Sequence, residues 1–78
     1  MNLDRLDIGQ KGRIVEVKGQ GALRKRLLDL GLTPKTQVLV RKKAPLGDPI
    51  EIHLRGFELT LRKDEAKHVV VERDENDN

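Results

Sequence analysis

The side chains best suited to metal binding or proton transfer are sparse in this chain, which has two histidines, no cysteine and no serine. His53 alternates with Glu51 and Arg55 along a strand-like segment, so we expect it on the solvent face. His68 follows a lysine at the edge of another such segment and is also expected at the surface. A metal centre needs three or four protein ligands. The sequence therefore predicts no resident metal or other cofactor, although a surface histidine beside a carboxylate could take up adventitious divalent metal.

No arrangement for covalent or acid–base catalysis is apparent either, and the lack of serine and cysteine excludes both as nucleophiles. Asp48 is held between Gly47 and Pro49, where a carboxylate typically accepts backbone N–H bonds of a turn. No second carboxylate has a fixed spacing from it. Gly19-Gln20-Gly21 precedes a helical segment but lacks the third glycine of a dinucleotide fingerprint and the Lys-Ser/Thr pair of a P-loop. The sequence predicts that the protein is not an enzyme.

Charge divides the chain into a basic body and an acidic end. Residues 72–78 hold four acids and one base, so residues 1–71 carry fifteen bases and nine acids. Residues 72–78 contain no apolar residue, and we expect a disordered acidic tail. The basic body could bind nucleic acid, but Phe57 is the only aromatic residue and bases would lack stacking platforms, so we expect no nucleic-acid partner. No apolar run approaches the ~18 residues of a membrane span and no signal peptide is apparent, so we expect a cytoplasmic protein.

One helix is predicted over residues 22–30. Its apolar stripe recurs at i, i+4 and i+7: Leu23, Leu27 and Leu30. Gly31 suits the left-handed position that ends a helix, with Leu32 packing back as in a Schellman motif. At about 100° per residue, Leu28 lies roughly 140° from the start of the stripe and is left without a core role.

The rest of the chain indicates a β domain. Period-two or β-branched patterns predict strands at residues 12–18, 37–42, 50–55, 58–62 and 68–71. Gly56-Phe57 is the expected hairpin turn, and Lys63–Ala66 is predicted to form one helical turn. We therefore predict a mostly β fold, a small SH3-like barrel of about five strands with one inserted α-helix, over residues 1–71. The predicted core is Val15, Val17, Leu23, Leu27, Leu30, Val38, Val40, Ile52, Leu54, Leu59, Leu61, Ala66, Val69 and Val71.

Four apolar residues are expected outside this core: Leu28, Leu39, Leu46 and Phe57. Leu28 and Leu46 both have charged surroundings, and the loop that carries Leu46 is bounded by prolines. A rigid loop loses little entropy when it docks. If these two leucines are adjacent in space, they predict a protein-docking surface, which could also support self-association.

Several short motifs occur together across most of the chain. They are Leu23–Leu32 (LRKRLLDLGL), Pro34, Ala44–Ile50 (APLGDPI), Arg55-Gly56 and Leu61–Ala66 (LRKDEA). This combination resembles the FeoA family, the small cytoplasmic components of the bacterial ferrous iron uptake system. The resemblance implies an SH3-like barrel with an inserted helix. It also implies an accessory or regulatory role as a partner of FeoB, the membrane ferrous iron permease.

Two groups of site residues follow from these patterns. We expect partner contact from Arg24, Leu28, Leu46 and Asp48, of which Leu28 rests on its helix position alone. The motif residues expected to act through folding are Leu23, Arg26, Leu27, Gly31, Pro45, Gly47 and Pro49. An alternative function is direct transition-metal binding or sensing through His53, His68 and nearby acids.

Overall fold

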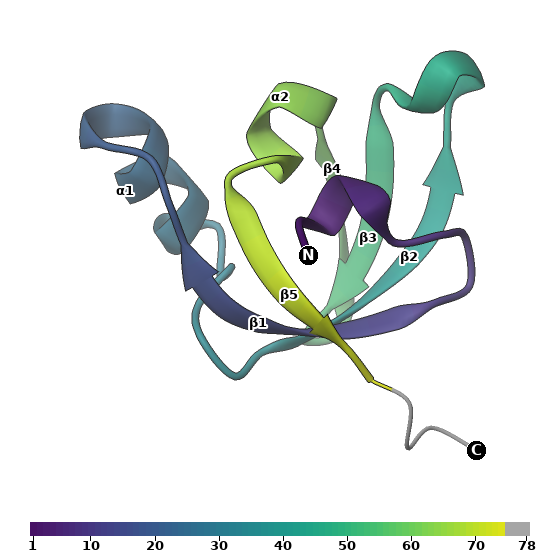
Figure 1. Cartoon of the computed structure of the whole chain (residues 1–78), viewed down its shortest axis with the longest axis horizontal. Coiled ribbons are helices and arrows are strands. Elements are labelled where there is room, and N and C mark those ends of the chain that lie inside the picture. Colours follow the sequence, from purple (N-terminus) through teal and green to yellow (C-terminus); the bar gives the residue numbers. More distant parts are fainter. Residues whose placement is uncertain (75–78) are drawn as a thin grey trace.

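Five strands form one antiparallel sheet in the order β4-β3-β2-β1-β5 in the computed structural model, which describes residues 1–74. Along the chain the elements are η1 (Leu3–Arg5), β1 (Lys11–Val17), α1 (Gly21–Asp29), β2 (Gln37–Lys43), η2 (Pro45–Gly47), β3 (Ile50–Leu54), β4 (Phe57–Leu61), α2 (Lys63–Ala66) and β5 (Val69–Arg73). The sheet is strongly bent, and α1 and η2 lie at opposite ends of the molecule (Figure 1). The predicted five-stranded β fold with an inserted helix is confirmed, and α2 is the predicted helical turn.

β1 contains a bulge that changes which of its residues face the core. In its pairing with β5, the register shifts between Ile14 and Glu16, so the strand carries an extra residue there. Ile14 is 1% exposed, whereas Val15 is 42% exposed. The prediction that Val15 faces the core is wrong, because strict alternation along a strand cannot anticipate the added residue.

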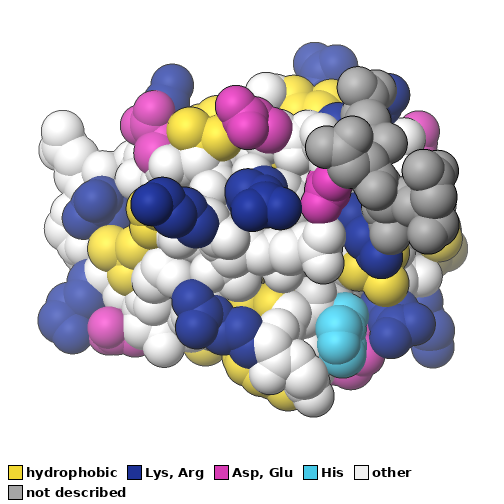
Figure 2. All heavy atoms as spheres, turned by 90° about the horizontal axis from the view of Figure 1, so that it is seen from below, with side chains coloured by type: hydrophobic (Ala, Val, Ile, Leu, Met, Phe, Trp, Pro, Cys, Tyr) yellow, Lys and Arg dark blue, Asp and Glu magenta, His cyan; other side chains and the backbone are white. Residues whose placement is uncertain are grey.

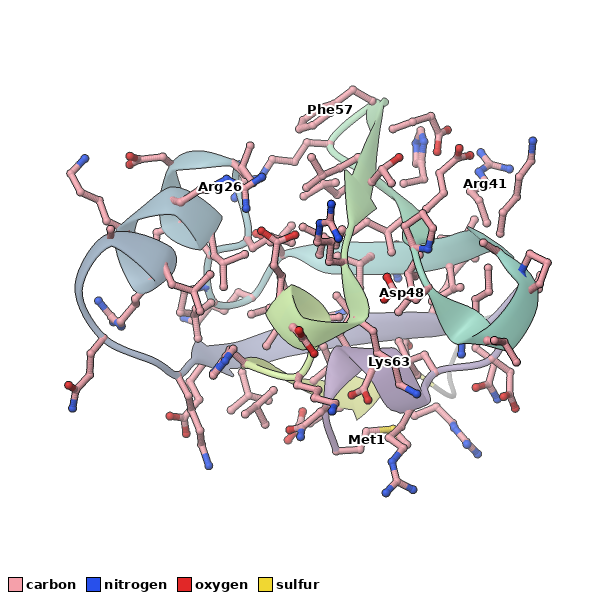
Figure 3. All side chains as sticks on the ribbon, turned by 90° about the horizontal axis from the view of Figure 1, so that it is seen from above. Met1, Arg26, Arg41, Asp48, Phe57 and Lys63 are labelled. Atoms are coloured by element: carbon pink, nitrogen blue, oxygen red, sulfur yellow. The ribbon has the colours of Figure 1, made fainter. Side chains whose placement is uncertain are left out.

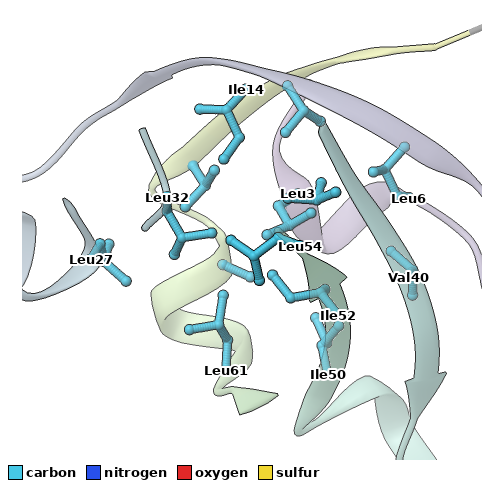
Figure 4. Close-up of a cluster of buried hydrophobic side chains, with 14 of the residues drawn as sticks. Leu3, Leu6, Ile14, Leu27, Leu32, Val40, Ile50, Ile52, Leu54 and Leu61 are labelled. Carbon is cyan, nitrogen blue, oxygen red and sulfur yellow. The ribbon is translucent and has the colours of Figure 1, made fainter. Parts of the chain in front are cut away.

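The core lies between the bent sheet and the segments that close it (Figure 4). Predicted core residues that are buried are Val17, Leu27, Val38, Val40, Ile52, Leu54, Leu61, Ala66, Val69 and Val71. Leu23, Leu30 and Leu59 are only partly buried and pack against this cluster. The sequence prediction left out five apolar residues that are fully or almost fully buried: Leu3, Leu6, Ile14, Leu32 and Ile50. Leu3 and Leu6 belong to the short N-terminal segment around η1, which therefore covers one side of the core.

α1 ends in the predicted Schellman motif. Gly31 has φ +101°, and its N–H donates to the carbonyl of Leu28 at 3.0 Å. The N–H of Leu32 donates to the carbonyl of Leu27 at 3.2 Å, which completes the pair of bonds that defines this motif. Glycine is required there because the left-handed region penalises a Cβ atom.

The β3–β4 hairpin turns one residue earlier than predicted. Leu54 pairs with Phe57, so the turn residues are Arg55 and Gly56. Their φ angles are +49° and +86°, and positive φ at both positions is typical of the type I′ hairpin turn. Phe57 is therefore the first residue of β4, where it is 43% exposed.

The sheet also extends further toward the C-terminus than predicted. β5 includes Glu72 and Arg73, which the sequence assigned to the acidic tail. Asp74 follows, and its carboxylate accepts a hydrogen bond from Gln37 at 2.6 Å and lies 3.8 Å from the guanidinium of Arg13. The remaining residues of the predicted tail, 75–78, lie outside the described residues. Within residues 1–74, no helix combines the length and apolar character that a bilayer crossing needs.

Candidate partner-binding surface

The loop between β2 and β3 presents Leu46 to solvent at a tight turn. The N–H of Gly47 donates to the carbonyl of Ala44 at 2.8 Å, and the N–H of Ala44 donates to the carbonyl of Pro49 at 3.0 Å. Pro45 and Leu46 are the central residues, and Leu46 has φ +69° and ψ +11°. A type II turn has this arrangement, and its third position favours glycine. Leu46 is nevertheless 97% exposed, so its side chain gives the fold almost no burial in return.

Asp48 connects this loop to α2. Its Oδ1 atom accepts a hydrogen bond from the backbone N–H of Lys63, the first residue of α2, at 3.1 Å. The first N–H groups of a helix have no partner inside the helix. The carboxylate therefore satisfies one of them and anchors the loop. Whether Asp48 also contacts a partner remains a prediction.

Arg26, which belongs to the helix motif Leu23–Leu32, also contacts α2. Its guanidinium forms an ion pair with Glu65, and Glu65 Oε1 accepts the backbone N–H of Arg62 at 2.9 Å. Arg26 and Asp48 also line one hollow of about 450 Å³, which β4 and α2 complete. Figure 3 shows Arg26 on α1 and Asp48 beyond β4. The helix motif and the loop motif thus meet at this short helix.

Arg24 has a contact within the fold. Its Nε atom donates to the carbonyl of Val17 at 3.1 Å, which ties the first turn of α1 to the end of β1. Its predicted contact with a partner stays a prediction.

Leu28 and Leu46 do not form one surface. Leu28 is half-buried and packs against the core, whereas Leu46 projects from η2. In two perpendicular views, α1 and η2 lie at opposite ends of the longest dimension (Figures 1 and 3), which measures 37 Å. The predicted joint docking surface is therefore wrong, because the helix packs across one end of the sheet while the loop extends from the other.

His53 faces outward beside β4, as its parity predicted. Its Nδ1 atom lies 2.8 Å from Glu58 Oε1, and the Nε atom of Arg41 lies 3.5 Å from the same oxygen. His68 is elsewhere, against Gly19 in the connection before α1. Within residues 1–74, no three His, Cys, Asp or Glu side chains are grouped in a way that could hold a metal ion.

Sequence reasoning missed the part that α2 plays in joining the two motifs. Glu65 stands three residues after Arg62, which is the spacing of the acidic residue in a capping box. That spacing is a signal that could have predicted how Glu65 reaches back to the helix start. Its pairing with Arg26 has no such signal, because it depends on how α1 packs.

The bent five-stranded sheet with a helix after its first strand places the chain in the class of small SH3-like domains. The chain belongs to the FeoA family, since the family model described as FeoA domain matches residues 1–73. A solved FeoA structure from Chlorobium tepidum is 38% identical with a TM-score of 0.88, covering 100% of this chain and 74% of that one. FeoA from Stenotrophomonas maltophilia, solved in complex with zinc and described as a prokaryotic SH3 domain protein, is 29% identical with a TM-score of 0.83. That match covers 92% of this chain and 89% of the other.

A curated relative joins this kind of domain to a transporter. It is the Fe(2+) transport protein A/Fe(2+) transporter FeoB fusion protein of Porphyromonas gingivalis (strain ATCC BAA-308 / W83). The two sequences are 35% identical over 72 residues, which are 92% of this chain and 8% of that protein. This chain thus spans only a small part of the fusion protein. The family to which it belongs is linked to ferrous iron transport.

Proposed function

We propose that this chain is a cytoplasmic, non-enzymatic accessory module of ferrous iron uptake that binds the cytosolic side of a FeoB-type transporter. The observation that carries the proposal is the relative in which Fe(2+) transport protein A and FeoB form one polypeptide. Covalent linkage keeps two binding partners at a high effective concentration. A separate chain of the same family needs a binding surface to achieve the same association.

Leu46 is the residue best placed to make that contact. The left-handed conformation costs a non-glycine residue about 1–2 kcal/mol, and the leucine is 97% exposed. Burying a leucine side chain against a partner stabilises a complex by roughly 1.5–3 kcal/mol. Strained backbone positions occur preferentially at ligand contacts and switches. Leucine at this turn adds almost nothing to the stability of the fold, whereas a partner that buries its side chain would gain binding free energy.

Asp48 and the hydrogen bonds of Ala44 support this role by fixing the loop. A loop that is already ordered loses little conformational entropy on binding. We therefore place the contact at the tip formed by residues 45–47, with Asp48 as the residue that positions it. Leu28, at the opposite end, is not part of this surface.

A pulldown with the FeoB-type transporter tests the proposal. Leu46→Asp should abolish capture, because a carboxylate cannot be buried unpaired in an apolar contact. Val15→Asp is the matched control, since Val15 is an exposed aliphatic residue on β1, and it should be captured like the wild type. Thermal melts first establish that each variant folds. Equal capture of Leu46→Asp and wild type removes the proposed surface, and failure to capture wild type removes the partner.

Direct transition-metal binding is the second candidate, and the pairing of His53 with Glu58 at 2.8 Å favours it. Two ligands fall short of the three or four that a protein metal site uses. Anaerobic calorimetry with ferrous iron separates the two functions. Affinity tighter than about micromolar that disappears in His53→Ala would favour metal binding, whereas no measurable heat leaves the transporter partner as the function.

A further inference from the structure

A second hollow, which we call the basic hollow, lies between the α1–β2 connection and the end of β3. Its volume is about 480 Å³, within the range of about 300–1,000 Å³ that is typical of small-molecule sites. Lys35, His53 and Arg55 contribute the cationic or titratable side chains of its lining. Figure 2 views the molecule from the side of this connection, and Lys and Arg side chains are spread over that face with Asp and Glu side chains among them. The basic hollow shares no lining residue with the hollow at α2.

Two residues of the basic hollow have strained backbones. Within residues 1–74, positive φ at a residue other than glycine occurs at Lys35 (+74°), Leu46 (+69°) and Arg55 (+49°). Arg55 is explained in part by its hairpin turn. Lys35 stands at the third position of a turn in which the N–H of Thr36 donates to the carbonyl of Thr33 at 3.2 Å. That position favours glycine, and a residue with a side chain there costs of order 1–3 kcal/mol. Two cations are therefore held at one site by backbone conformations that side chains usually avoid.

The guanidinium of Arg55 is fixed in place without a carboxylate. Its Nη2 atom donates to Thr33 Oγ1 and to Thr36 Oγ1, both at 2.8 Å. Thr36 is only 7% exposed, so one of the two hydroxyl groups that hold the guanidinium is buried in the fold. The ion pairs described for residues 1–74 engage neither Arg55 nor Lys35. The Nε and Nη1 donors of Arg55 thus remain available to a ligand.

The nearby carboxylates have other cationic or polar partners. Glu58 is shared by His53 and Arg41, and Asp74 is held by Gln37 and lies beside Arg13. The two unpaired cations therefore keep a positive field over the basic hollow. A guanidinium held in place by its Nη2 atom, with Nε and Nη1 donors left over, and an ammonium group together supply the N–H donors and the positive charge that suit a phosphate group.

We propose that the basic hollow binds the phosphate group of a small phosphate-bearing ligand. Arg55 donates to the phosphate through its Nη1 atom, Lys35 supplies the second charge, and His53 borders the remainder of the ligand. This site is independent of the transporter contact at Leu46. A loss of one function therefore leaves the other measurable.

An NMR titration of the full chain with pyrophosphate, at constant ionic strength, tests the site. Saturable shifts should be confined to the amides of residues 33–39 and 53–55. Lys35→Gly should weaken binding at least fivefold and should melt no lower than wild type, because glycine tolerates a positive φ. Lys18→Gln is the control, because it removes one positive charge at a residue that does not line the basic hollow, and it should bind pyrophosphate like wild type. Shifts spread evenly over the basic surface, no saturation at tens of millimolar, or equal affinity of Lys35→Gly and wild type would each overturn the proposal.

The source of the phosphate is decided by co-sedimentation with vesicles that contain phosphatidic acid. Co-sedimentation that is lost in Lys35→Gly supports the site and assigns a lipid headgroup. Pyrophosphate binding without co-sedimentation supports the site and assigns a soluble phosphate. Co-sedimentation that Lys35→Gly leaves unchanged, with no pyrophosphate binding, contradicts the site.

Discussion

At the scale of single residues, Leu46 shows a conflict between the fold and the surface. Its φ of +69° suits glycine better than leucine, so Leu46→Gly should raise the free energy of unfolding by about 1 kcal/mol. For a domain of this size that gain corresponds to roughly 4–8 °C in melting temperature. Thermal and urea melts measure the gain, and pulldown should show reduced transporter capture. A Leu46→Gly variant less stable than wild type would mean that the leucine contributes to the fold.

At the scale of elements, α2 depends on the carboxylate that anchors the β2–β3 loop to it. Asp48→Ala removes the acceptor of the Lys63 N–H, and loss of a comparable helix-capping group costs about 1 kcal/mol. Urea unfolding measures the change. Asp29→Ala is the control, because its ion pair with Lys25 is exposed and is worth about 0.3–0.5 kcal/mol. Equal effects of the two substitutions would show that the loop is not anchored through Asp48.

β1 and the η1 segment also depend on each other, through a close approach at Gly12. A Cβ atom there would lie 2.8 Å from Leu6 Cδ1 and 3.3 Å from the carbonyl oxygen of Glu72. Gly12→Ala should therefore destabilise the protein by about 1–3 kcal/mol, the usual cost of overpacking. A double-mutant cycle with Leu6→Val measures the contact, because residues in contact do not add independently. If the destabilisations caused by Gly12→Ala and Leu6→Val simply add, the strain in Gly12→Ala does not come from the contact with Leu6.

The elements themselves could be predicted where pattern and end signals agree. The helix stripe and Gly31 predict α1 and its end, and both are confirmed. Val15 and Ile14 could not be assigned correctly, because a bulge reverses the inside and outside faces of a strand without changing its composition. Leu3 and Leu6 were not predicted to be in the core, because a short segment without clear periodicity is buried only when the bent sheet packs against it.

At the scale of the whole molecule, the motifs could be identified but their arrangement could not. The periodicity of the helix showed that Leu28 lies off the apolar stripe. Periodicity carries no information on the distance from α1 to η2. Those elements lie at opposite ends of the molecule, whereas Arg26 and Asp48 converge on α2 (Figures 1 and 3). Such long-range placement depends on the bend of the sheet. The sequence therefore supports the family and the residues of the motifs, and the tip of the β2–β3 loop is the surface that we propose from the structure.

Site-specific photo-crosslinking in cells that contain the FeoB-type transporter tests this surface most directly. A photoreactive amino acid replaces Leu46 in one variant and Val15 in the other, two exposed positions on different elements. We expect the probe at position 46 to crosslink to a cytosolic segment of the transporter, and the probe at position 15 to give no such product. Mass spectrometry identifies the crosslinked peptide. A transporter crosslink from position 15 and none from position 46 would contradict the account.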